Sequence, residues 1–201
     1  MKISIILAHP TPNSFNHAIA RTIADVLAAR GHTPFIHDLY AEQFDPVMLS
    51  AEIDKDAILP ADIERHCQEV CSVDGLVIVH PNYWSSPPAI LRGWVDRVLR
   101  PGRAYEFVPD DKGGAAPVGL LKAKIGMVFN TANTPQEIEE QVFGDPLQTH
   151  WLKVVFGLCG IPAVYRRNFA PVITSTPDER RQWLDEVKTA VEQHFPADAS
   201  A

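Results

Sequence analysis

Hydrophobic residues gather along this chain into five short runs that show little alternation with polar residues. The clearest runs cover residues 3–8, 75–79 and 125–130, and two weaker ones cover residues 33–38 and 163–169. A strand loses the alternation of apolar and polar side chains when helices cover both faces of its sheet. The runs therefore predict a parallel sheet of five strands.

Segments with apolar residues at helical spacing separate these runs. Three of them follow Ser14, Pro88 and Thr176, and two more cover residues 61–72 and 147–158. Ser, Thr and Pro are typical of helix starts. Alternating strands and helices indicate a doubly wound α/β fold. We therefore expect three layers, with helices on both faces of the sheet, in a single domain over residues 1–201.

The remaining local signals mark two helix starts and one surface segment. The pattern Thr-Pro-x-Glu occurs at residues 134–137 and 176–179. Each copy predicts a capping box, with Thr as the N-cap, Pro at the first helical position and Glu at the third. Residues 101–121 are rich in Gly and Pro, which predicts an excursion on the surface.

The composition limits the class of protein. The chain has 201 residues and a net charge of −7, which argues against a nucleic-acid-binding face. Its three cysteines, Cys67, Cys71 and Cys159, lack metal-ligand spacing, so we expect free thiols, a reducing compartment and no metal site. The first strand begins at once, and no apolar run is long enough for a membrane span. We therefore expect a cytoplasmic protein.

The loops after the strands at 3–8, 75–79 and 125–130 meet at one edge of the sheet, because parallel strands end on the same side. The first loop holds hydroxyl and amide groups beside a helix N-terminus, which favours a phosphate. The second offers Tyr83 and Trp84 as walls for a planar ring. The third, residues 130–134, adds small side chains and hydrogen-bonding groups. Together the loops predict a nucleotide-like ligand with a flat ring, a flavin.

Each loop also has a plainer interpretation when it is taken alone. Ser14 is consistent with a simple helix cap, Trp84 with a plug at the end of the core, and the third loop with an ordinary connection. His80 ends a buried strand, which favours a hydrogen-bonded core histidine over a catalyst. Arg166 and Arg167 fit either a charged strand end or a site for the phosphates of NAD(P)H.

Several segments carry a family resemblance. They are Ala8-His9-Pro10 with Ser14-Phe15-Asn16, Asp38-Leu39-Tyr40 with Phe44-Asp45-Pro46, and residues 81–99 around Trp84. The chain resembles, over essentially its whole length, the NAD(P)H:quinone oxidoreductases and related bacterial flavin-dependent NAD(P)H oxidoreductases. The resemblance implies a flavodoxin-like three-layer sandwich whose five parallel strands have the order 2-1-3-4-5.

The resemblance also implies the residues that bind the cofactor. The phosphate end of the flavin would be held by His9, Thr11, Ser14, Phe15 and Asn16. The ring would be held by Pro81, Asn82, Tyr83, Trp84 and Ser85, together with Asn130, Thr131, Ala132 and Asn133. Arg181 falls where FAD-binding members place an arginine near the adenylate, which favours FAD over FMN. The family completes its flavin site with a second subunit, so a homodimer is expected.

The implied activity is transfer of a hydride from NAD(P)H, through flavin N5, to a quinone or a similar small acceptor in a ping-pong two-electron reduction. Asn130, Thr131 and Asn133 are the candidates for stabilising charge on the reduced ring. Two alternatives are a flavin-binding regulatory module, for example of a potassium efflux system, and a flavodoxin-like electron carrier.

The sequence departs from the family pattern in two places. The family has a Thr-Thr-Gly-Gly loop where this chain has residues 130–133, so Ala132 and Asn133 bring side chains to positions that are bare in the family. A Tyr and a His that relay charge in the family align with Glu137 and Phe143. The relay is therefore not carried over to this chain, and His150, Tyr105 and a water stay open as its replacement.

Overall fold

Five parallel strands form the central sheet of the computed structural model, which describes residues 1–109 and 113–197. They are β1 (Lys2–Leu7), β2 (Thr33–Asp38), β3 (Gly75–Pro81), β6 (Ile125–Thr131) and β7 (Ala163–Phe169). Their order is β2-β1-β3-β6-β7. Strands β1, β3 and β6 are therefore the three central strands, and the loops at their carboxyl ends are neighbours.

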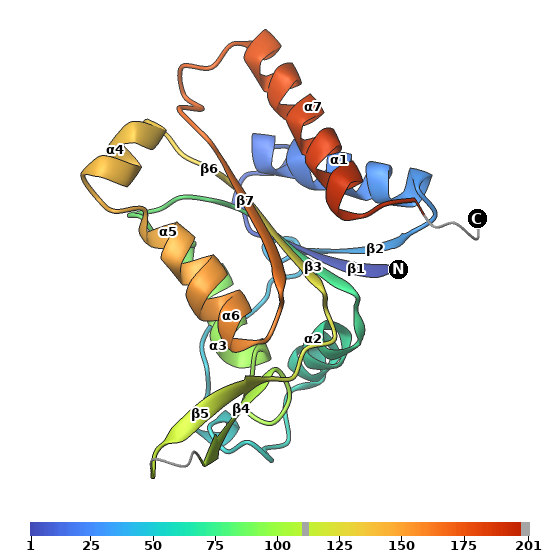
Figure 1. Cartoon of the computed structure of the whole chain (residues 1–201), viewed down its shortest axis with the longest axis vertical. Coiled ribbons are helices and arrows are strands. Elements are labelled where there is room, and N and C mark those ends of the chain that lie inside the picture. The colour runs from blue at the N-terminus through green and yellow to red at the C-terminus, as the bar shows by residue number, and fades with distance from the viewer. Residues whose placement is uncertain (110–112, 198–201) are drawn as a thin grey trace.

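Helices cover both faces of this sheet (Figure 1). On one face, α1 (Phe15–Ala29) and α7 (Pro177–His194) pack on side chains such as Ile5, Val77 and Met127. On the other face, α2 (Ala61–Ser72), α3 (Ala89–Val98) and the helical residues 146–158 pack on Ile6, Ile78 and Val128. Alternate residues of each strand thus pack into two separate hydrophobic cores. This explains why apolar and polar residues do not alternate in the strand sequences.

The predicted sheet and its two helix layers are confirmed, but one element was not expected. Strands β4 (Tyr105–Pro109) and β5 (Ala115–Gly119) form an antiparallel hairpin within the predicted excursion. The fourth and fifth parallel strands are consequently β6 and β7. The strand order is 2-1-3-6-7, and it differs in this numbering from the predicted 2-1-3-4-5. Residues 110–112 of the excursion lie outside the described ranges.

The helical segment after β6 is less regular than its apolar pattern predicts. It consists of α5 (Pro146–Gln148), a π-helical stretch over Thr149–Val155 and α6 (Phe156–Leu158). A π-helical stretch of this kind widens the helix by one residue per turn and often lies near functional sites. A short 3₁₀ helix, Ser50–Glu52, lies in the long connection between β2 and α2.

Two of the three predicted helix caps are confirmed. Ser14 caps α1, and Thr176 with Glu179 forms a complete capping box at α7. The box predicted at residues 134–137 is wrong. Helix α4 (Gln136–Gln141) has Pro135 as its N-cap and no side-chain cap, because the helix begins one residue later than the pattern predicts.

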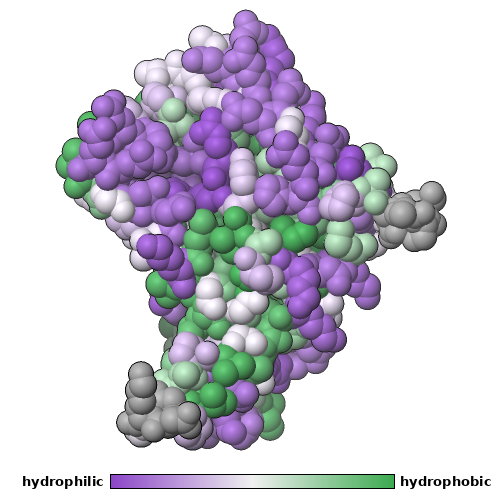
Figure 2. All heavy atoms as spheres, in the orientation of Figure 1, coloured by the Kyte–Doolittle hydropathy of each residue, from purple (hydrophilic) through white to green (hydrophobic). Residues whose placement is uncertain are grey.

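Figure 2 shows how the surface divides on one face of the molecule. Hydrophobic side chains gather over the lower half, where the β4-β5 hairpin and residues 149–158 lie, whereas the upper half is hydrophilic. Exposed apolar residues of this region include Phe107, Val118 and Val154. In the part of the chain that the structure describes, none of the helices has the length and hydropathy needed to span a membrane.

Candidate functional site

A cavity of about 360 Å³ lies at the carboxyl edge of the sheet, where the loops after β1, β3 and β6 meet. Residues from all three predicted loops line it, joined by two residues that the sequence did not single out, Val172 and Arg180. The predicted residues are His9, Ser14, Phe15, Asn16, Pro81, Asn82, Tyr83, Thr131, Ala132 and Asn133. The convergence of the three loops on one cavity, which the sequence predicts, is thus present in the structure.

A second cavity, of about 550 Å³, shares part of this lining. Asn82, Tyr83, Ala132 and Asn133 border both cavities. The second cavity adds aromatic and polar walls: Trp84, Ser85, Thr134, Glu139 and Phe143. The two cavities are therefore adjacent, and both border the loop that follows β3.

The first loop combines a helix N-terminus with a buried amide. Ser14 caps α1, so the free N–H groups of the first helical turn are close to the cavity. Asn16 donates from Nδ2 to Thr131 Oγ1 at 2.9 Å, and its own Oδ1 is buried without a hydrogen-bond partner among the described residues. Burial lowers the pKa of His9, which favours the neutral ring at neutral pH.

The second loop contains a strained turn. The backbones of Tyr83 and Ser86 exchange two hydrogen bonds of 3.0 Å. Trp84 and Ser85, between them, have φ angles of 55° and 51°. Left-handed backbone at a non-glycine residue costs roughly 1–2 kcal/mol. Because the Trp84 side chain is fully exposed, no burial of its ring offsets this cost, and such strain is characteristic of functional positions.

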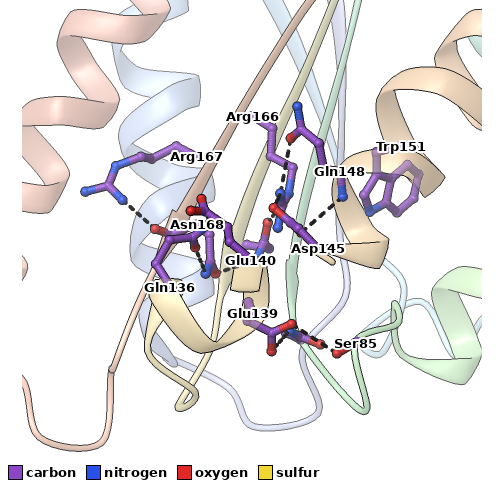
Figure 3. A network of polar contacts seen from close by, with 12 residues as sticks. Ser85, Gln136, Glu139, Glu140, Asp145, Gln148, Trp151, Arg166, Arg167 and Asn168 are labelled. Atoms are coloured by element: carbon purple, nitrogen blue, oxygen red, sulfur yellow. Dashed lines mark hydrogen bonds and ion pairs between the residues drawn. The ribbon is translucent and has the colours of Figure 1, made fainter. Parts of the chain in front are cut away.

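Glu139 of α4 holds this turn in place (Figure 3). Its Oε1 accepts a hydrogen bond from Asn82 Nδ2 at 2.9 Å, and its Oε2 accepts one from Ser85 Oγ at 3.0 Å. Only 3% of Glu139 is exposed. Sequence reasoning missed this residue, because a glutamate in a short polar helix gives no sign of burial until the turn is packed against it.

Asn82 presents a second unpartnered acceptor. Its Nδ2 is used by Glu139, and its Oδ1 is buried with no hydrogen-bond partner in the described structure. Its backbone N–H donates to Thr131 O at 2.6 Å, which ties the second loop to the third. Asn16 and Asn82, two residues of the cavity lining, thus each carry an amide oxygen that is buried without a partner among the described residues, and a buried acceptor of this kind is normally satisfied by a hydrogen-bond donor.

The third loop is fixed by the connection that follows β7. Ala132 N–H donates to Phe169 O at 3.0 Å, and Val172 N–H donates back to Ala132 O at 2.9 Å. Ile173 N–H donates to Asn133 Oδ1 at 3.0 Å. These contacts bring Val172 to the cavity wall, a position that no pattern in the sequence predicts.

Asn130 does not line either cavity, contrary to the expectation that its side chain faces the flavin. Its Nδ2 donates to Asn168 Oδ1 at 2.5 Å, and its Oδ1 accepts from Arg166 Nε at 2.9 Å. The reason is that β6 continues to Thr131, one residue beyond the predicted strand end. Strand alternation then directs Thr131 to the cavity and Asn130 to the opposite face.

Two other predicted residues also lie outside the lining. Thr11 donates its backbone N–H to His9 Nδ1 at 3.0 Å and so orients that ring instead of facing the cavity. The Arg181 side chain is 69% exposed and pairs with Asp178. Its neighbour Arg180 lines the cavity, held by Ser175 through contacts of 2.8 and 3.0 Å. Arg181 is thus exposed outside the lining, and the preference for FAD over FMN stays a prediction.

His80 is a core histidine, as its place in the strand predicted. Its Nδ1 donates to Pro81 O at 2.8 Å, and its Nε2 accepts from Trp151 Nε1 at 2.9 Å. Burial lowers its pKa to about 3, so the ring is neutral. Arg166 is also internal: only 4% of its side chain is exposed, and it pairs with Asp145 at 2.6 Å, as Figure 3 shows. His80 is therefore enclosed in the core, whereas Arg166 and Arg167 also border a separate cavity of about 530 Å³.

Among the described residues, His37, Glu42 and His66 bring potential metal ligands within 4.8 Å of one another. The hydrogen bonds of His66, however, disfavour a metal at this cluster. Trp94 Nε1–H donates to His66 Nδ1 at 3.3 Å, so neutral His66 carries its hydrogen on Nε2, the atom that faces Glu42 at 3.3 Å. A metal at Nε2 would set the Nδ1–H against the Trp94 N–H. The three cysteines are free thiols, as expected, and Cys67 and Cys159 are buried.

The lining fits a flavin, judged by the chemistry of its groups. The first helical turn of α1 and Arg180 favour an anion at one end of the cavity. Asn16 and Asn82, whose amide oxygens have no partner among the described residues, add polar groups to the lining, and the ribityl chain and the ring of a flavin carry hydroxyl and N–H donors that suit such groups. Tyr83 and Pro81 provide apolar surface for a planar ring.

Comparison with known proteins places the chain in a family. A family model described as the flavodoxin-like fold matches residues 1–195, and the chain belongs to this family. A relative from Haemophilus influenzae, called an uncharacterized NAD(P)H oxidoreductase, is 34% identical over 164 residues, which cover 80% of this chain and 79% of the relative. The ribosyldihydronicotinamide dehydrogenase [quinone] of Pongo abelii is 30% identical over 89% of this chain and 86% of its own.

A solved structure shows the same fold at lower identity. The FMN-dependent NADH-azoreductase of Bacillus anthracis, in complex with FMN, superposes with a TM-score of 0.76 and 17% identity, covering 96% of this chain and 99% of the azoreductase. This likeness is to the fold of the azoreductase.

Proposed function

We propose that this chain binds a flavin in the 360 Å³ cavity and reduces quinones or similar small electron acceptors with NAD(P)H. The observation that carries the proposal is the convergence of three loops on one cavity, whose lining includes a helix N-terminus, Arg180 and the exposed ring of Tyr83. The names of the relatives, an NAD(P)H oxidoreductase and a quinone-linked dehydrogenase of ribosyldihydronicotinamide, support the same class of reaction.

The residues divide the work of holding the cofactor. Ser14, the first turn of α1 and Arg180 would bind the phosphate end. Asn16 and Asn82 would accept hydrogen bonds from the ribityl and ring donors, and Tyr83 would pack on the ring. When bound, a flavin would supply the redox chemistry, the two-electron transfer from NAD(P)H to the acceptor.

The third loop keeps the role of stabilising charge, without the side chain of Asn130. Thr131 and Asn133 line the cavity and provide polar groups beside the ring position. The two residues that align with the family's Tyr and His do not replace that relay: Phe143 borders the second cavity but cannot carry a proton, and Glu137 does not line it. Stabilisation of charge by the fixed polar groups of this loop is the contribution that we assign to it.

The second cavity suits the planar substrates. Tyr83, Trp84 and Phe143 give it aromatic walls next to the proposed ring position. NAD(P)H and a quinone would occupy this one space in turn, which predicts ping-pong kinetics. Trp84, fully exposed in the single chain, and the apolar region in Figure 2 favour a homodimer that covers part of this surface.

The experiment that tests this function is steady-state kinetics on protein saturated with FMN or FAD. NADH and NADPH are varied at several concentrations of 1,4-naphthoquinone. The expected result is turnover with parallel double-reciprocal lines. Absence of turnover with either flavin would contradict the activity, and intersecting lines would contradict the shared substrate site. Sedimentation at micromolar concentration should show a dimer.

A further inference from the structure

A chain of hydrogen bonds runs from the cavity to a nearly buried histidine. Ser14 Oγ lies 2.8 Å from His17 Nδ1, and His17 Nε2 lies 3.0 Å from Asp38 Oδ2. Ser14 lines the cavity, whereas only 8% of His17 is exposed. The proposed phosphate end is thus connected to a titratable group that does not itself line the cavity.

Asp38 determines where the hydrogen of His17 lies. Its Oδ1 accepts the backbone N–H groups of Tyr40 and Ala41 at 3.1 and 3.2 Å, and its Oδ2 faces His17. A carboxylate that accepts at both oxygens has no hydrogen to give, so His17 Nε2 is the donor. In the neutral ring, Nδ1 is therefore a bare acceptor.

The protonation state of His17 then sets the direction of the Ser14 hydroxyl. With a neutral ring, the hydroxyl donates to His17 Nδ1 and presents only lone pairs to the cavity, which opposes an anion. With a charged ring, Nδ1–H donates to Ser14 Oγ, which already faces the backbone N–H of His17 at 3.4 Å. Both interactions use the oxygen as acceptor, so the hydroxyl hydrogen is free to point into the cavity.

We propose that His17 is a positioning residue that takes up a proton when the phosphate end of the flavin binds, and thereby turns the Ser14 hydroxyl toward the phosphate. The inference rests on the proposed function, since it needs an anionic flavin in this cavity. It goes beyond it by linking cofactor affinity to pH through a residue outside the lining. The added positive charge and the redirected donor both favour the bound phosphate.

The other charged and titratable groups around His17 each favour, disfavour or leave unchanged its charged form. Asp38, at the end of β2, favours the charged ring. His9, in the first loop, has its ring centre 6.2 Å from that of His17 and disfavours the charged ring only when it is itself charged. On α1, Arg21 is engaged by Asn13 Oδ1 at 2.8 Å. From α7, Arg180 adds a fixed charge to the cavity that does not change with pH in this range.

The test is titration of the flavin-free protein with FAD between about pH 5.5 and 8.5, where the diphosphate of FAD keeps its charge. Binding should weaken by about tenfold per pH unit above the range in which His17 is charged in the free protein. The His17→Gln variant should lose this slope, and its FAD affinity should fall most at low pH. Riboflavin, which has no phosphate, should bind with no such slope.

Three comparisons make the result decisive. His9→Gln should bind FAD more weakly at every pH but keep the slope, and His194→Gln, at the far end of α7, should match the unmodified protein. Calorimetry of the unmodified protein across this pH range, in two buffers of different ionisation enthalpy, should show net proton uptake with FAD and none with riboflavin. This second measurement does not depend on the folding of a variant.

The outcomes separate the two proposals. If FAD binds and its pH slope is the same in His17→Gln and the unmodified protein, the inference about His17 is overturned and the proposed function stands. A slope that disappears in His9→Gln instead would assign the proton to His9. If neither FAD, FMN nor riboflavin binds, the proposed function fails and the inference fails with it.

Discussion

Ser85 Oγ donates a hydrogen bond to Glu139 Oε2 at 3.0 Å, and this contact joins the turn that carries Trp84 to helix α4. Asn82 Nδ2 donates to the other carboxylate oxygen at 2.9 Å. Glu139 is 3% exposed, so its two oxygens depend on these donors instead of water. The strained turn that borders both cavities is therefore held from outside the three predicted loops.

The Glu139→Ala variant should lower both stability and flavin affinity. It leaves Asn82 Nδ2 and Ser85 Oγ without their partner, and an unsatisfied buried polar group costs about 1–3 kcal/mol. The turn would then be free to move, so we expect flavin to bind about tenfold more weakly. Chemical denaturation and fluorescence titration with FMN and FAD measure the two effects.

Glu140→Ala is the matched control. Glu140 is next to Glu139 on α4, but its carboxylate is exposed and bonds only Gln136 at 2.7 Å among the contacts that the structure describes. This variant should keep the flavin affinity of the unmodified protein. Equal affinities for the two alanine variants would contradict the role of Glu139.

Replacement of Trp84 by Gly and by Ala should separate backbone strain from the role of the ring. Both variants remove the side chain, but only Gly accepts a φ of 55° without strain. Trp84→Gly should therefore be more stable than Trp84→Ala by roughly 1 kcal/mol. Quinone reduction should fall to a similar extent in both. An alanine variant at least as stable as the glycine variant would show that the turn is not strained.

Arg166 and Arg167 are neighbours on β7 that should differ sharply in their effect on stability. Arg166 pairs with Asp145, and their side chains are 4% and 13% exposed, so Arg166→Met leaves a nearly buried carboxylate unpaired. We expect a loss of about 3 kcal/mol in the free energy of unfolding. Arg167 pairs with Glu186 at the surface, and Arg167→Met should cost less than about 1 kcal/mol. Similar costs in urea denaturation would count against the buried pair.

His37 should make stability depend on pH. Burial lowers the pKa of His37, but its hydrogen bonds to Glu69 and Glu42 outweigh burial, so the pKa is raised above 6.5. A histidine whose pKa is higher in the folded than in the unfolded protein contributes its full stabilisation at pH values below the unfolded-state pKa. This contribution is lost as the pH rises through the folded-state pKa.

The stability deficit of His37→Gln should accordingly be largest below about pH 6.5 and shrink as pH rises. Denaturation at a series of pH values measures it. Glu69→Gln weakens the same pairing. Above the pH range in which carboxylates titrate, its stability deficit should also shrink as the pH rises. A His37→Gln deficit that stays constant across this range would rule out a charged His37.

The sheet and the meeting of the three loops were predictable, because each rests on a local signal. Apolar runs without alternating polar residues identify strands that are buried on both faces of the sheet. Parallel strands have their carboxyl ends at the same edge of the sheet. The β4-β5 hairpin was missed, since its strands, Tyr105–Pro109 and Ala115–Gly119, are mostly exposed and contain Gly and Pro. Such sequences do not differ from those of loops.

Two of the residues that were predicted for the site do not line the cavity, and the reason is different. Asn130 and Arg181 each lie one position from a residue that lines the cavity, Thr131 and Arg180. A shift of one residue reverses the face in a strand and turns a side chain by about 100° in a helix. Motif spacing identifies the loop, but the exact length of the adjoining strand or helix decides which side chain enters the cavity. Glu139 could not be found at all without the packing of α4.

The most direct test of a flavin site is the visible absorption spectrum of the purified protein, recorded before and after denaturation. The native protein should show flavin bands, and denaturation should release FMN or FAD in about one equivalent per chain, which also identifies the cofactor. Protein purified without flavin should recover these bands when FMN or FAD is added. A colourless protein that takes up neither flavin would mean that the three loops define a fold and not a cofactor site.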